Sequence, residues 1–185
     1  MQKEMQRQYV DTNLVQFVER LRKDSYDEVE GLCDNATKQI GRLENTGLQH
    51  ATTQYTSTCG ELIAEIRMYI AERKEKFIPY LQSLSEKAET NHDCSSCSGG
   101  CKINHDLQLI ELKASHSGMR SILNRLQVVA LPLYSDTAFP DAYRVLRNQM
   151  ALIENGLTEL FFLEENYLLP KVVDAQKRIN AGHKY

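Results

Sequence analysis

A short segment in the middle of the chain concentrates side chains that bind metal ions. Residues 92–101 read His-Asp-Cys-Ser-Ser-Cys-Ser-Gly-Gly-Cys, and a second histidine follows four residues later. Only two small residues separate Cys94 from Cys97, a spacing that lets both thiolates turn toward one ion. Cys101 and His105 are four apart, so on a helix they share one face. Three sulfurs and one imidazole predict a closed tetrahedral site of the kind that holds structural zinc.

The same segment supports other interpretations. His92 can substitute for His105 as the fourth ligand. An iron–sulfur cluster would use the three cysteines with a fourth ligand from elsewhere, for which Cys33 and Cys59 are the candidates. A Cys-x-x-Cys pair also lowers one thiol pKa and suits redox chemistry, and reduced thiols on a flexible loop are the simplest alternative. We expect a bound metal, zinc ahead of iron or an iron–sulfur cluster.

The composition sets the class of protein. The chain has 185 residues, of which 25% are charged, and a net charge of −3 with a pI near 6.0. This acidity argues against nucleic acid as a partner, because phosphate binding needs a cationic face. No apolar run approaches the ~20 residues of a membrane span, and residues 1–9 lack a signal-peptide segment. We expect a cytoplasmic protein with reduced thiols, free of membrane, whose partners are a metal ion and either a second copy or another protein.

Helical periodicity dominates the chain, which predicts an all-α fold of one domain over residues 1–185. We expect an N-terminal helix within 1–23, a first helix pair within 24–88, the Cys/His loop over 89–105 and a second helix pair within 106–180. Asp24 or Ser25 would cap the second helix. The third long helix is expected from Asn104 to Ala130, and a linker over 131–140.

A weak internal repeat relates the two pairs. Phe77-Ile-Pro79 and Leu168-Leu-Pro170 lie near the ends of two long helical patterns. Aligning these prolines superposes Tyr69 on Leu160, with core positions matching on the preceding turns. A proline inside a helix costs roughly 3 kcal/mol unless a kink accommodates it. The repeat predicts an antiparallel four-helix up-down bundle with the additional short N-terminal helix outside it.

From about residue 25 to 180 the chain resembles the hemerythrin-like (HHE) four-helix bundle family. Residues 160–170, Leu-Phe-Phe-Leu-Glu-Glu-Asn-Tyr-Leu-Leu-Pro, are similar to that family's His-x-x-x-Glu-x-x-x-Leu-Phe-Pro segment. Residues 112–116, Leu-Lys-Ala-Ser-His, are similar to its histidine-bearing third helix. The resemblance implies a bundle whose interior carries a non-haem di-iron site. Members of the family bind or sense oxygen, respond to redox state, handle iron, or assist iron–sulfur repair under nitrosative stress.

The ligand set that the resemblance implies is degenerate in this sequence. Glu164 and His116 match family ligands, but Leu160 stands where a histidine is expected. Tyr69 and Arg73 occupy the His and Glu positions of the repeat-related helix. Cys33 occupies the position related to His116. Our hypothesis is that a buried Arg73 pairs with Glu164 and replaces the charge of the metal.

These features together favour a metal-binding, hemerythrin-like protein that is not an enzyme. It would serve as a sensor of redox state, oxygen or nitric oxide, or as an iron-handling module. The alternatives are a redox or iron–sulfur-repair protein that uses the cysteines, and a structural helical interaction protein without metal. A hydrolase is disfavoured, since the sequence has no Ser/His/Asp pattern and no nucleotide-binding loop.

Overall fold

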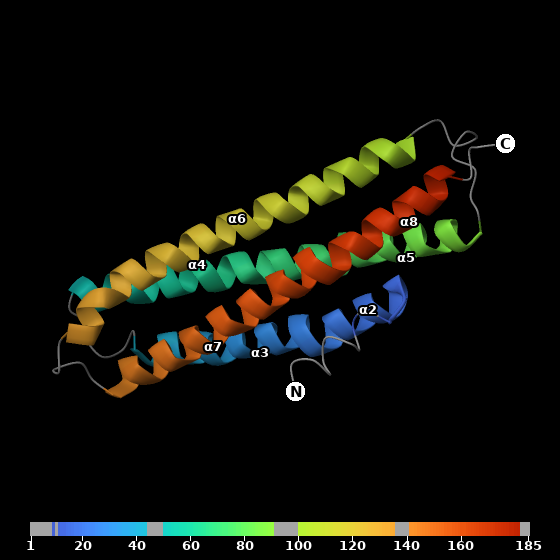
Figure 1. Ribbon diagram of the computed structural model, residues 1–185. Helices are drawn as coiled ribbons and strands as arrows, with labels where there is room; N and C mark the ends of the chain where they lie inside the picture. The colour runs from blue at the N-terminus through green and yellow to red at the C-terminus, as the bar shows by residue number, and fades with distance from the viewer. Residues whose placement is uncertain (1–8, 10, 44–49, 91–99, 136–140, 182–185) are drawn as a thin grey trace.

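The fold is all-α, as predicted. The computed structural model describes residues 9, 11–43, 50–90, 100–135 and 141–181, and within these ranges four long helical rods and no strand are present. Successive rods run in opposite directions along one long axis (Figure 1). Within this part of the chain, no helix combines the length and the apolar character that crossing a membrane requires.

The first rod is continuous where the sequence predicted a break. It consists of α2 (Leu14–Arg20), the π-helical segment η1 (Leu21–Tyr26) and α3 (Asp27–Leu43). The predicted boundary at residues 22–24, with Asp24 or Ser25 as N-cap, is therefore wrong. The cap is Asn13, whose side chain accepts a hydrogen bond from the Gln16 amide at 2.8 Å. Because Leu21 and Tyr26 are both buried, a widened helical turn keeps both in the core, and the N-terminal helix belongs to this rod.

The second and fourth rods share one design. The second consists of α4 (His50–Glu72), η3 (Arg73–Phe77) and α5 (Ile78–Glu89), and the fourth of α7 (Asp141–Leu163), η5 (Glu164–Leu168) and α8 (Leu169–Ala181). Pro79 and Pro170 are each the second residue after a π-helical segment. A proline has no N–H and its ring clashes with the carbonyl four residues earlier. The wider π turn just before it relieves that clash, so each rod passes its proline without a break.

The third rod is the single helix α6 (Gly100–Ser135). It is longer at both ends than predicted. Residues 100–105 belong to the helix rather than to the Cys/His loop, and the helix continues past Ala130 through Pro132. Pro132 has no N–H to donate to the Val128 carbonyl, and only three more residues of the helix follow it.

The rods bury one shared core. α3 packs against α7 and α4, α4 against α6, and α5 against α8 and α2. Leu62, Ile66, Ile153 and Leu157 have no exposed surface, and each such side chain contributes roughly 1.5–3 kcal/mol through burial. These apolar layers also enclose a few charged side chains near the middle of the rods.

Candidate functional site

Among the described residues, one arginine, one histidine and one glutamate lie in the core, on three different rods. Arg73 is 2% exposed, and His116 and Glu164 are 0% exposed. Arg73 and Glu164 are the first residues of η3 and η5, and His116 lies on α6. A buried charge costs several kcal/mol unless it is paired and hydrogen-bonded. These residues therefore need partners, and π-helical segments are frequent at functional positions.

Glu164 is the centre of the group. Its Oε1 accepts a hydrogen bond from the Tyr26 hydroxyl at 2.5 Å. Its Oε2 accepts a short hydrogen bond from the Tyr69 hydroxyl and faces His116 Nε2 at 2.6 Å. Arg73 Nε lies 3.9 Å from Oε1, close enough for an ion pair but too far for a hydrogen bond. We call these five residues the interior cluster.

The tyrosines and the arginine keep their protons in this setting. Burial raises the pKa of Tyr26 and of Tyr69 well above its usual value, and the charge of Glu164 raises both further. Both hydroxyls therefore remain donors. Burial opposes the charge of Arg73, but Tyr69 and Glu164 outweigh it and raise the pKa of the guanidinium.

The guanidinium of Arg73 is held mainly by aromatic rings. It lies 4.5 Å from the ring centre of Tyr69 and 4.9 Å from that of Phe77. Its Nε and Nη2 atoms are buried without a hydrogen-bond partner. Cation–π contacts and the charge of Glu164 therefore compensate these two nitrogens in place of direct hydrogen bonds.

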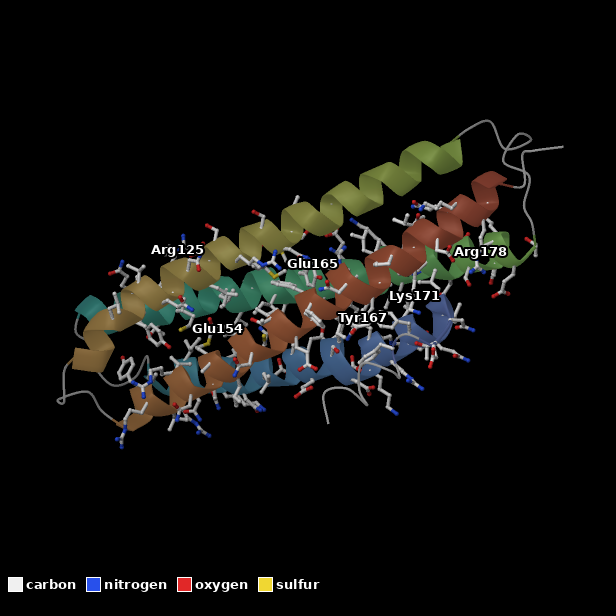
Figure 2. All side chains as sticks on the ribbon, in the orientation of Figure 1. Arg125, Glu154, Glu165, Tyr167, Lys171 and Arg178 are labelled. Carbon is white, nitrogen blue, oxygen red and sulfur yellow. The ribbon has the colours of Figure 1, made fainter. Side chains whose placement is uncertain are left out.

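His116 connects the cluster to the surface. Its Nδ1 faces Glu165 Oε1 at 2.8 Å while Nε2 faces Glu164. A carboxylate accepts hydrogen bonds, so each ring nitrogen of His116 faces an acceptor oxygen. Glu165 also accepts from Arg120 at 2.8 Å, and Figure 2 shows it between α6 and the fourth rod. Burial raises the pKa of Glu165, but the bonds from His116 and Arg120 outweigh this and lower it.

The interior cluster does not fit a di-iron centre. Such a centre needs several carboxylates and histidines with free lone pairs converging on the ions. Here both oxygens of Glu164 already accept from protein donors, and Arg73 adds a positive charge beside them. Glu164 and Glu165 bind opposite edges of the His116 ring and cannot meet at one ion. Among the described residues, no group of three or more His, Cys, Asp or Glu side chains is arranged to hold a metal ion.

Most of the residues singled out in the bundle interior come together. Tyr69, Arg73, His116 and Glu164 form one cluster, including the hypothesised pair of Arg73 with Glu164. Cys33 is buried on α3, where burial raises the pKa of its thiol to about 12. The hydrogen bonds and ion pairs found in the described ranges do not connect Cys33 to the cluster.

The sequence interpretation missed Tyr26, Glu165 and Arg120. Tyr26 lies seven residues before Cys33, two turns away on the same helix face, so the stripe that contains Cys33 could have pointed to it. Arg120 lies one turn after His116, and Glu165 is adjacent to Glu164 in the sequence. Only the tertiary contact between α6 and η5 brings these two side chains together.

The predicted metal site falls largely outside this part of the chain. His92, Cys94 and Cys97 lie outside the described residues. Cys101 and His105 belong to the first turns of α6, but their side chains also lie outside the description. Cys59, considered as an additional ligand, is buried on α4, and burial raises the pKa of its thiol to about 12. At neutral pH Cys59 is therefore a thiol rather than the thiolate that metals bind.

Comparison with known proteins identified no match. No family model, no curated protein and no solved structure matches this chain. The class of protein is therefore argued from its own residues: an all-α protein with an ion-paired cluster in its core.

Proposed function

We propose that this protein is a hemerythrin-like four-helix up-down bundle that binds its metal outside the bundle interior. In this proposal Cys94, Cys97, Cys101 and His105 hold one zinc or iron ion, and the protein acts in the cytoplasm as a sensor or iron-handling module without enzymatic activity. The observation that carries the proposal is Glu164, fully buried and bonded to Tyr26, Tyr69 and His116 with Arg73 beside it.

The interior cluster supports the first half of this proposal. In a di-iron bundle, metal cations would neutralise the buried carboxylates. Here Arg73 supplies positive charge, two tyrosine hydroxyls supply hydrogen bonds, and His116 Nε2 faces the same carboxylate. The scaffold can therefore stay folded without interior metal, and its core needs no cofactor.

The second half rests on the spacing of the loop cysteines and on where α6 begins. The thiolate is the form of cysteine that binds metal and is oxidised first, so a metal–thiolate site reports on oxidants and nitrosating agents. α6 begins at Gly100 and also carries His116. Along that axis His105 lies about 16 Å and Cys101 about 22 Å from His116, at 1.5 Å per residue. Loss of the metal would release the first turns of α6, which gives the signal a path to the bundle.

Elemental analysis of anaerobically purified protein tests the proposal. We expect one zinc or iron per chain, lost in the Cys94→Ser/Cys97→Ser variant and retained in Glu164→Gln. Ser95→Ala/Ser96→Ala is the matched control, because it changes the same loop without removing a sulfur. We also expect the cysteine variant to melt at a lower temperature, because the binding energy of a structural metal adds to folding.

Each other outcome points to a different function. Two irons per chain that survive the cysteine changes but disappear in His116→Ala would refute the proposal in favour of an interior di-iron site. A labile chromophore of cluster type would favour iron–sulfur chemistry. If the protein binds no metal even when metal is supplied in excess, the remaining interpretation is a structural helical protein.

A further inference from the structure

A groove runs along the surface between α3 and α7. The volume of this groove is about 560 Å³. Its lining includes the apolar side chains of Val29, Leu32 and Leu152. The carboxylates of Asp24, Glu28 and Glu159 line it as well.

The groove lies at one end of a longer face formed by both helices. Residues seven apart lie on one stripe of a helix, and on α3 such a stripe carries the exposed side chains Glu28, Asn35 and Arg42. On α7 the matching stripe carries Val145, Leu152 and Glu159. Val145 is 44% exposed and Leu152 is 53% exposed, although both are large and apolar.

The charge on this face changes sign along its length. α3 and α7 run in opposite directions (Figure 1), so Glu28 and Glu159 lie at the same end of the face. Arg42 follows Glu28 by fourteen residues, which places it about 21 Å further along the helix at 1.5 Å per residue. The face is therefore acidic at one end, apolar in the middle and basic at the end where Arg42 lies.

We propose that this face binds a second copy of the chain, in an antiparallel arrangement with two-fold symmetry. A two-fold axis through the middle of the face places Leu152 near Leu152 of the second copy. It also places Arg42 of each copy opposite the Glu28 and Glu159 end of the other. A two-fold interface must be complementary to itself, and a face with opposite charges at its two ends meets that requirement.

The size of the face suits a reversible dimer. α7 has 23 residues, which makes it about 35 Å long, and two adjacent helices are roughly 20 Å wide. The face therefore offers about 700 Å² per copy, close to the ~800 Å² of a standard specific interface. Since much of this area is polar, we expect a dimer that dissociates on dilution.

Sedimentation velocity over a wide range of protein concentration tests this inference. We expect a monomer–dimer equilibrium in which Leu152→Glu raises the dissociation constant at least ~100-fold, because it buries two facing carboxylates without partners. Val128→Glu is the matched control: Val128 is 63% exposed on α6, which lies at the opposite edge of the molecule from α3 (Figure 1). Circular dichroism of each variant confirms that it is folded.

A charge exchange tests the antiparallel arrangement separately. Glu28→Arg and Arg42→Glu should each weaken the dimer, whereas the double variant should restore it, since every facing pair again has opposite signs. A wild-type chain that is monomeric throughout would overturn the inference. So would a dimer that tolerates Leu152→Glu, or a double variant weaker than both single variants.

Discussion

Replacing Glu164 by glutamine removes the buried carboxylate that accepts from Tyr26 and Tyr69, faces His116 and pairs with Arg73. Glutamine keeps the size and one acceptor oxygen, but it leaves the buried Arg73 without its counter-charge and His116 Nε2 without its carboxylate partner. Two unit charges 3.9 Å apart, the distance from Arg73 Nε to Glu164 Oε1, attract by about 4 kcal/mol at an effective dielectric constant near 20. Removing one partner of a buried pair costs about 3–5 kcal/mol of unfolding free energy. For a chain of this length we expect the melting temperature to fall by roughly 6–20 °C.

A double-mutant cycle with Arg73→Met isolates the ion pair. Arg73→Met alone should cost less than Glu164→Gln, because Glu164 keeps its bonds to Tyr26, Tyr69 and His116. In the double variant neither buried charge remains without its partner. The loss of unfolding free energy should therefore be smaller than the sum of the two single losses by about 1–3 kcal/mol. Urea denaturation followed by circular dichroism measures all three variants. If the two single losses of unfolding free energy add up to that of the double variant within about 0.5 kcal/mol, Arg73 and Glu164 do not interact as described.

A surface substitution on the same rod provides the control. Glu154 on α7 accepts a hydrogen bond from Gln127 at 2.5 Å near the surface (Figure 2). Glu154→Gln should change the unfolding free energy by no more than about 0.5 kcal/mol. A loss as large as that of Glu164→Gln would show that the charge in the core is not the cause.

The remaining predictions concern buried thiols and helical glycines. Burial raises the pKa of Cys33 and of Cys59 to about 12. The unfolded chain therefore loses these protons first, and stability falls as pH rises from about 9 toward 12. Urea titrations across this range should show a shallower fall in the Cys33→Ala/Cys59→Ala variant, and equal slopes would contradict the assignment. Gly60→Ala should stabilise the protein by about 0.5–1 kcal/mol, because a Cβ there meets nothing within 4 Å. Gly156→Ala should gain less or lose stability, because its Cβ would lie 3.1 Å from Val29 Cγ2; thermal melts of both variants decide, and an equal gain would show that Val29 moves aside freely.

The π-helical segments explain how one chain can bury both apolar layers and a charged cluster. Arg73 and Glu164 stand at equivalent positions of the repeat, each at the start of a π turn that precedes a proline. The widened turn changes the direction of the side chains that follow it relative to a regular helix. In this protein the turns bring an arginine and a glutamate from two rods to one point in the core.

The sequence by itself determined the fold class and the repeat. The period of the apolar residues requires helices whatever their partners, and Pro79 and Pro170 mark equivalent places because proline acts locally on the backbone. The same local logic failed at residues 22–24, where capping residues predicted a break. There the burial of Leu21 and Tyr26, a tertiary effect, kept the chain helical.

Only the tertiary structure decided which side chains form the cluster. The sequence predicted one interior group made of Cys33, Tyr69, Arg73, His116 and Glu164. Spacing along the helices could not show which of these side chains contact one another. The contact of η5 with α6 and with the first rod selected Tyr26 over Cys33 and added Glu165 and Arg120. Hydrogen bonds between residues 138 positions apart, such as that from Tyr26 to Glu164, depend on how whole helices pack, and no local pattern encodes that.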